Sequence, residues 1–292
     1  MKKMKLQVLL FAVLAIVVSS CNMSQNKDSE DKKEIKMAYV DGWASGVAMT
    51  HVAQVILEQN GYEVETMAAA VDLIYASLAH GDVDVFMESW MPVTHGAKVE
   101  KFGDKIVSLN VNTDQARLGL VVPGYVDINS IEELNDVAEK FDGKIIGIEK
   151  GAGITGMTEK AIEEYELKNM EQLNSSGIAM LSELTKAIKE ERWLVVAGWA
   201  PHWKFGRYEL KFLDDPKKVY GETERIETYA RAGYTNDDPW AGEFFSNFHL
   251  SDEQAGGILA TFKDGGDDKH ATAQKWVEDN KELVQSWLPK SE

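Results

Sequence analysis

Three tryptophans stand at or just after the ends of short apolar runs: Trp43 after "MAYVDG", Trp90 in "VFMESWMPVTH" and Trp199 in "VVAGWAPHW". A cation over the face of an indole ring gains about 0.5–1 kcal/mol when exposed and roughly 2 kcal/mol when desolvated. Three rings around one cation would therefore contribute on the order of 3–6 kcal/mol. A quaternary ammonium suits such rings because its methyl groups carry no hydrogen-bond donors. These residues predict an aromatic cage for a methylated cation.

A second recognition element is expected, because micromolar affinity needs about 8 kcal/mol and the rings alone fall short. The segment "GIEKGAGITGMTEK" follows a strand-like run and opens a helical one. Its glycines let backbone N–H groups approach an anion at a helix N-terminus, and Gly153 and Ile154 are the predicted donors to a carboxylate. His95, which follows Trp90 closely, is a candidate for one more hydrogen bond. Together these residues predict a zwitterionic ligand.

The glycine segment also allows a different chemistry. Gly151, Gly153 and Gly156 match the G-x-G-x-x-G pattern of dinucleotide-binding sites, and Glu171 lies at about the expected distance for its acidic residue. Against this interpretation, Glu149 and the lysine after it separate the strand from the first glycine, and Glu171 precedes a strand instead of ending one. An exported α/β enzyme that uses this loop is the alternative from another class of function.

Other catalytic and metal-binding patterns are missing from the sequence. It contains neither H-E-x-x-H nor G-x-S-x-G, and its six histidines are too scattered for a zinc cluster. Cys21 is the sole cysteine, and lipidation explains it better than catalysis does. We therefore predict a binding protein that has no catalytic residues, no metal and no cofactor.

The elements that must position these residues alternate between strand-like and helical patterns. The strand-like runs are "IKMAYV", "GYEVETM", "DVDVFME", "KIVSLN", "RLGLVVP", "KIIGIE", "EQLNSS", "RWLVVAGW" and "RIETYARAGY". Helical patterns cover residues 46–60, 71–79, 95–102, 157–165, 178–189, 251–262 and 271–288, and "SIEELNDVAEKF" opens on a capping box of Ser130 and Glu133. Strands separated by helices in this way predict parallel α/β sheets.

The two Trp-x-Pro stretches close two separate series of strands and helices, which predicts two similar α/β lobes. Ligands in open α/β sheets bind outside the carboxyl ends of the strands. The strand ends of both lobes are therefore expected to face a shared cleft that contains the cage. The other tryptophans occur at a strand start or in helical context and are expected to be packing residues: Trp193, Trp203, Trp240, Trp276 and Trp287.

The first part of the chain has the features of an export signal. Lysines at positions 2, 3 and 5 precede an apolar run that is too short to span a membrane, so residues 1–20 are interpreted as a signal peptide. The "VSSC" that ends at Cys21 resembles the lipobox of bacterial lipoproteins. Residues 21–35 are polar and charge-mixed, which predicts a lipid-anchored flexible tether. The formal net charge of −17 argues against a nucleic-acid partner.

From about Lys36 to Trp287 the chain resembles the substrate-binding proteins of glycine betaine/proline betaine ABC transporters. The resemblance is carried by "AYVDGWASG", "GYEVET", "ESWMPVTH", "LGLVVPGYVDINSIEEL", "IIGIEKGAGI", "VAGWAPHWKFGRYELKFLDDPK" and "ETYARAGY". It implies a two-lobed, periplasmic-binding-protein-like fold of type II, with α/β sandwich lobes joined by crossing strands. We expect lobe I to comprise residues 36–117 and 225–292, and lobe II residues 118–224.

The resemblance also implies the function and the roles of the site residues. Trp43, Trp90 and Trp199 would form the aromatic cage, and the backbone of Gly153 and Ile154 would bind the carboxylate with help from His95. The protein would be exported and lipid-anchored, and it would deliver glycine betaine or proline betaine to a membrane permease for osmoprotectant uptake. A choline- or carnitine-binding receptor of the same type is the alternative within this class.

Overall fold

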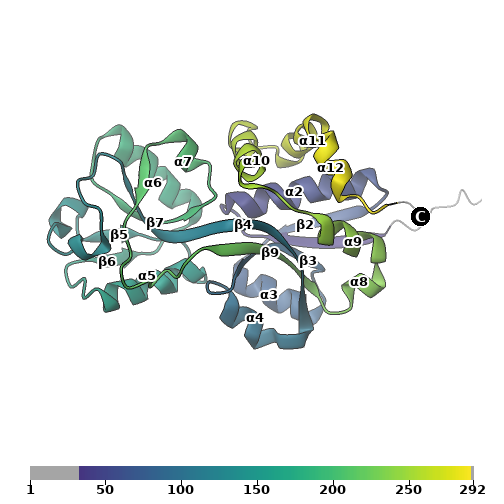
Figure 1. The fold of residues 1–292 in the computed structure, drawn as a ribbon, viewed down its shortest axis with the longest axis horizontal. Helices are drawn as coiled ribbons and strands as arrows, with labels where there is room; N and C mark the ends of the chain where they lie inside the picture. The colour runs from purple at the N-terminus through teal and green to yellow at the C-terminus, as the bar shows by residue number, and fades with distance from the viewer. Residues whose placement is uncertain (1–32, 291–292) are drawn as a thin grey trace, which may run out of the picture. The chain divides into compact units, whose positions relative to one another are not determined.

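The computed structural model describes residues 33–290, so the predicted signal peptide, Cys21 and most of the predicted tether lie outside the described residues. From Glu34 onwards the chain forms one compact unit (Figure 1). Its first strand, β1 (Glu34–Tyr39), begins inside the predicted tether, because Ile35 is buried in the core and pairs with Val64. In the described part of the chain, no helix combines the length and hydropathy that a membrane span requires.

Nine strands of the described residues form a continuous sheet in the order β2-β1-β3-β9-β4-β7-β5-β6, with β8 paired to β4. The strands after β1 are β2 (Glu63–Ala68), β3 (Val85–Met91), β4 (Ile106–Pro123), β5 (Lys144–Ile146), β6 (Glu171–Leu173), β7 (Val195–Ala200), β8 (Leu210–Phe212) and β9 (Glu224–Arg231). Strand β1 runs parallel to β2 and β3, and β5 runs parallel to β6 and β7, as the alternation of elements predicted. Strands β4 and β9 are antiparallel to their neighbours and join these two groups.

Strand β4 corrects one expectation from the sequence. The runs "KIVSLN" and "RLGLVVP" suggested two strands, but residues 106–123 form a single long one. Its first part pairs with β9 as far as Ala116, and its last part pairs with β7 from Arg117. Irregularities in the β4–β9 register allow the strand to bend without ending, because a bulge inserts residues locally while pairing continues on both sides.

The longer helices match the sequence-based expectations closely. The helices are α2 (Ala44–Gln59), α3 (Val71–His80), α4 (Gly96–Phe102), α5 (Gly153–Glu164), α6 (Gly177–Lys189), α7 (Lys204–Arg207), α8 (Tyr234–Asp237), α9 (Pro239–Asn247), α10 (Asp252–Asp264), α11 (Lys269–Asp279) and α12 (Lys281–Trp287). Around the strands β1–β3, α2, α10 and α11 lie on one side and α3 and α4 on the other (Figure 1). Helix α5 begins four residues earlier than the pattern suggested, which places Gly153 in its first turn.

Two expected helices are interrupted. The segment "SIEELNDVAEKF" forms two short 3₁₀ turns, Ile131–Glu133 and Ala138–Phe141, although the capping box of Ser130 and Glu133 is present. Asn135 lies between the turns, and its side chain accepts a hydrogen bond from the Asn169 backbone N–H, so it is committed to a tertiary contact. The helical stretch 271–288 is divided into α11 and α12 at Asn280.

Candidate ligand-binding site

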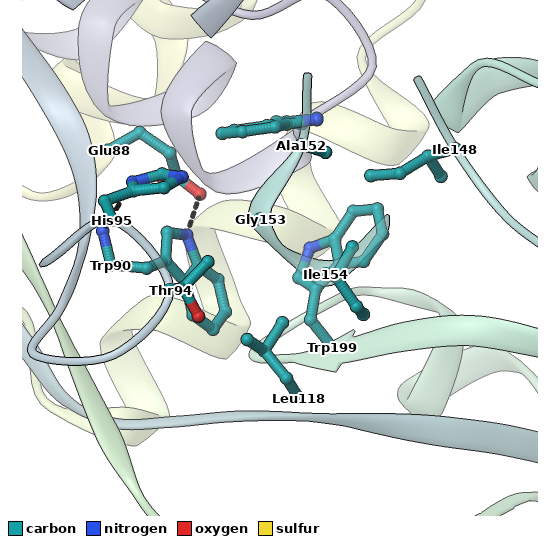
Figure 2. Close-up of a pocket in the computed structure, with 11 residues that line it drawn as sticks. Glu88, Trp90, Thr94, His95, Leu118, Ile148, Ala152, Gly153, Ile154 and Trp199 are labelled. Atoms are coloured by element: carbon teal, nitrogen blue, oxygen red, sulfur yellow. Dashed lines mark hydrogen bonds between the residues drawn. The ribbon is translucent and has the colours of Figure 1, made fainter. Parts of the chain in front are cut away.

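All six residues that the sequence singled out for the ligand line one pocket with about 300 Å³ of empty space. Figure 2 shows Glu88, Trp90 and His95 on one side of this space and Ile148, Ile154 and Trp199 on the other. The complete lining is Trp43, Glu88, Trp90, Thr94, His95, Leu118, Ile148, Ala152, Gly153, Ile154 and Trp199. Residues far apart in the sequence therefore meet around one small pocket.

Each cage tryptophan occupies the end of a strand or the start of a helix. Trp90 lies near the end of β3, Trp199 near the end of β7, and Trp43 is the residue before α2. All three are only 4–6% exposed, although they face a cavity, because the surrounding elements close over it. The other five tryptophans do not line this pocket, in agreement with their predicted role in packing.

Carboxyl groups hold two of the indole rings. The Nε1–H of Trp90 donates to Oε1 of Glu88 at 3.0 Å, and the Nε1–H of Trp43 donates to Oε1 of Glu149 at 2.6 Å. The second bond connects the start of α2 with the loop before α5, two segments that are far apart in the sequence. An acceptor on the indole N–H fixes the ring's orientation and draws electron density towards its π face, which strengthens its attraction for a cation.

Two other side chains, Lys204 and His202, contact the Trp199 ring. The Nζ atom of Lys204 lies 4.6 Å from the centroid of the Trp199 ring and donates to the Trp199 carbonyl at 2.9 Å. Lys204 is fully buried, and this burial lowers its pKa well below the usual value. The ring of His202 packs edge-on against Trp199 at 5.3 Å between centroids. These contacts fix the orientation of the Trp199 indole.

His95 is held as a neutral hydrogen-bond donor. Its Nδ1 accepts a hydrogen bond from the backbone N–H of Trp90 at 3.0 Å, so the ring proton resides on Nε2. Burial, with a smaller contribution from Lys98, lowers the pKa of His95 to about 3. Its Nε2 is buried and has no hydrogen-bond partner among the described residues. A neutral ring with an unused N–H can donate to a ligand oxygen, as the sequence analysis suggested.

The start of α5 supplies further donors. Gly153 and Ile154 are the first two residues of the helix, where backbone N–H groups have no acceptor within the helix itself. The residue before them, Ala152, offers no capping side chain. Only glycine fits at position 153, because a Cβ there would lie 2.4 Å from the Cγ2 atom of Thr94. The helix start therefore approaches the β3–α4 loop closely and presents its donors to the pocket.

Five further residues line the pocket and were not predicted from the sequence: Glu88, Thr94, Leu118, Ile148 and Ala152. Glu88 is the most consequential of them, since it is a carboxyl group that is 1% exposed inside a pocket of aromatic and apolar groups. A signal for it was available, because it interrupts the otherwise buried apolar strand "VFMESWM". An ionisable residue in the middle of a buried apolar strand is often part of a functional site.

The pocket does not suit the rival chemistries. Among residues 33–290, no group of three or more His, Cys, Asp or Glu side chains is arranged to hold a metal ion. Gly153 of the G-x-G-x-x-G pattern is packed directly against Thr94, so this face of the glycine offers no room for a pyrophosphate. The arrangement fits a small ligand that combines a methylated cation with an anion.

Comparison with known families agrees with this geometry. Residues 33–279 match the family model for the substrate-binding domain of ABC-type glycine betaine transport systems. The chain belongs to this family. Membership makes it an extracytoplasmic substrate-binding protein and not an enzyme, as predicted from the sequence.

Solved structures of relatives share the fold. The glycine/betaine/L-proline-binding protein ProX of Borrelia burgdorferi is 38% identical, with a TM-score of 0.85, over 88% of this chain and 97% of that one. Lactococcal OpuAC, solved in its closed conformation with glycine betaine, is 32% identical, with a TM-score of 0.82, over 88% and 100%. These matches confirm the predicted α/β fold of the type II periplasmic-binding-protein class.

A curated relative is similar over a shorter stretch. The glycine betaine/carnitine transport binding protein GbuC of Listeria monocytogenes is 42% identical over 154 residues, which is 52% of this chain. The matched stretch spans 51% of GbuC, about half of that protein's length.

Proposed function

We propose that this protein captures glycine betaine, or a related quaternary-ammonium zwitterion such as proline betaine, and delivers it to an ABC permease for osmoprotectant uptake. The observation that supports this best is the meeting of Trp43, Trp90 and Trp199 with the start of α5 around one small cavity. The indole faces suit methyl groups that carry positive charge. The N–H groups of the helix start, with the neutral His95, suit a carboxylate.

The names of the relatives support the same ligand class. ProX, OpuAC and GbuC are all described with glycine betaine, and GbuC also with carnitine. A choline- or carnitine-binding receptor of the same type is the second candidate. The buried carboxyl group of Glu88 favours choline within this second candidate, because choline has no carboxylate of its own and an ionised Glu88 would supply the negative charge.

We further propose that the protein works by closure of two lobes, residues 36–117 with 225–292 and residues 118–224. The change of β4 from pairing with β9 to pairing with β7 near residues 116–117 supports this division. Contacts such as Trp43–Glu149 and Thr94–Gly153 join the two lobes around the pocket. A ligand that touches both lobes would shift the population towards the closed form.

The anchor is proposed from the sequence alone. Cys21 would carry the lipid, and residues 21–35 would tether the receptor to the membrane next to its permease. Mass spectrometry of the protein purified from membranes would test this. A diacylglycerol-modified Cys21 at the mature N-terminus is expected, whereas an unmodified cysteine would disprove the anchor.

Isothermal titration calorimetry of the full chain in mild detergent, with glycine betaine, choline, carnitine and proline, tests the function. Glycine betaine is expected to bind with micromolar or tighter affinity and proline weakly, since proline lacks the methylated ammonium. If choline alone binds, the aromatic cage is supported and the carboxylate-binding role of the α5 start is wrong. If none of the four ligands gives a detectable heat of binding, the proposed function is wrong.

A further inference from the structure

The pocket lining contains one acidic side chain, Glu88 on β3. The remaining lining residues are aromatic, aliphatic or small, apart from Thr94 and His95, and burial keeps His95 neutral. Glu88 is therefore the lining residue that can bring a full charge to the cavity at physiological pH. A buried carboxylate is costly unless its oxygens are compensated. The groups that stabilise the buried Glu88 carboxylate therefore indicate its role.

The two oxygens of Glu88 have different surroundings. Oε1 accepts hydrogen bonds from the Ser45 hydroxyl at 2.6 Å and from the Trp90 Nε1–H at 3.0 Å, and Figure 2 shows the second of these. Oε2 is buried and has no hydrogen-bond partner among the described residues. A Cβ built on Gly46 would lie 3.3 Å from Oε2, so the carboxyl group sits beside the first turn of α2. One oxygen thus fixes the cage, and the other retains its capacity to interact.

We propose that Glu88 is a specificity-determining residue that supplies the counter-charge for the ligand's ammonium group and so allows the pocket to accept permanent cations that have no carboxylate. This inference rests on the proposed function, because it assigns a role within the same cage. Choline and tetramethylammonium are the ligands concerned. Glycine betaine depends less on Glu88, because its own carboxylate already neutralises it and is repelled by the same charge.

The environment of Glu88 leaves its ionisation responsive to a ligand. Burial raises the pKa of Glu88 to about 7, against the opposing effect of the hydrogen bonds from Ser45 and Trp90. Helix α2 presents only uncharged groups to it at Ser45 and Gly46. The titratable groups on the other elements around β3 include Tyr75 on α3, His95 and Lys98 after β3, and Arg225, Glu227 and Tyr229 on β9, where Arg225 forms an ion pair with Glu227.

None of these groups neutralises Glu88. The pKa of Tyr75 is raised by its burial, which keeps it protonated, and the ammonium of Lys98 pairs with Asp72. A cation in the pocket stabilises the ionised carboxylate, so its binding below pH 7 releases a proton. Affinity for a permanent cation is therefore expected to rise as the pH increases to about 7 and then to level off.

The experiment compares the wild-type full chain in detergent with Glu88→Gln, titrated calorimetrically with choline and glycine betaine at pH values from 5 to 8. The amide oxygen of glutamine can still accept the hydrogen bonds from Ser45 and Trp90, so the cage geometry is retained while the charge is lost. Choline affinity is expected to fall by about 100-fold in the variant at pH 8, and glycine betaine affinity by less than about fivefold. The rise of choline affinity with pH in the wild type is expected to disappear in the variant.

The outcomes separate this inference from the function on which it rests. If the wild type binds glycine betaine but not choline, or if Glu88→Gln weakens both ligands by the same factor, Glu88 holds the cage in place and the specificity role is wrong. If the wild type binds neither ligand, the proposed function itself fails. A choline affinity that does not change with pH in the wild type would also overturn the counter-charge.

Discussion

Gly153 lies at the closest approach between the α5 side of the pocket and the β3–α4 loop. A Cβ at this position would lie 2.4 Å from the Cγ2 of Thr94 and 2.6 Å from its carbonyl oxygen. Nonbonded carbon atoms need about 3.5–4 Å. The Thr94 backbone is poorly able to move away, because its N–H donates to the Glu224 carboxylate at 2.9 Å. Gly153→Ala is therefore expected to keep the two sides of the pocket apart.

The size of the effect follows from the contacts that would be lost. A separation of about 1 Å relieves the clash but takes the N–H groups of Gly153 and Ile154 out of hydrogen-bond reach of a ligand held by Trp43 and Trp90. A hydrogen bond to a charged group contributes about 1.5–3 kcal/mol. Loss of two such bonds costs about 3–6 kcal/mol, which raises the dissociation constant by roughly 10²- to 10⁴-fold.

Calorimetric titration with glycine betaine measures this change, and thermal unfolding checks that the variant folds. Gly156→Ala is the matched control, because Gly156 lies in the same helix and a Cβ there meets nothing within 4 Å. The control is expected to bind normally and to gain up to about 1 kcal/mol of stability, since alanine is the better helix former. A folded Gly153→Ala protein that binds within about threefold of the wild type would refute the close-approach argument.

Three further predictions concern the pocket. Trp199→Ala is expected to weaken glycine betaine binding at least about tenfold in calorimetry, since one cage ring is lost; an unchanged affinity would exclude this indole from the cage. Glu149→Ala removes the acceptor of the Trp43 Nε1–H and is expected to weaken binding about tenfold by the same assay, with Lys150→Ala as the neutral control; equal affinities would show that the bond is dispensable. Because burial raises the pKa of Glu88 to about 7, above its value of 4.5 in an unfolded chain, the folded state binds the extra proton between these pH values. As the pH rises from 4.5 to 7, the unfolding free energy of the ligand-free wild type is therefore expected to fall by up to about 3 kcal/mol relative to that of Glu88→Gln. Urea denaturation of both proteins across this pH range measures the difference. The same pH dependence of stability in both proteins would contradict the prediction.

The sequence predicted most of the secondary structure, because its apolar periodicity reflects burial directly. The pattern of 71–79 became α3 and that of 178–189 became α6 with shifts of one residue at one end. The failures occurred where long-range contacts override local preference. Asn135 is drawn into a hydrogen bond with Asn169, and the two halves of β4 are joined through their common partner β9.

More than half of the pocket lining was predictable from residue type and position in the sequence. Trp90 and Trp199 were recognisable because large aromatic residues at strand ends are poorly explained by sheet packing, and Gly153 because its segment opens a helix. Glu88 was not singled out: its interruption of an apolar run marks it as unusual, but only the fold shows that its side chain lines the same pocket as the indoles. The protonation of His95 likewise depends on a backbone N–H that only the folded loop brings to its Nδ1.

Residue types and local patterns established which chemical groups are available: indole rings, glycines at a helix start, and the strands and helices that carry them. The tertiary structure decided how these groups act together. It placed residues from β3, β7 and the starts of α2 and α5 around one cavity, buried Glu88 and His95 there, and tied Trp43 to Glu149 across the pocket. Burial, hydrogen bonding and charge at the site depend on distances between residues that are remote in the sequence, and local patterns do not encode those distances.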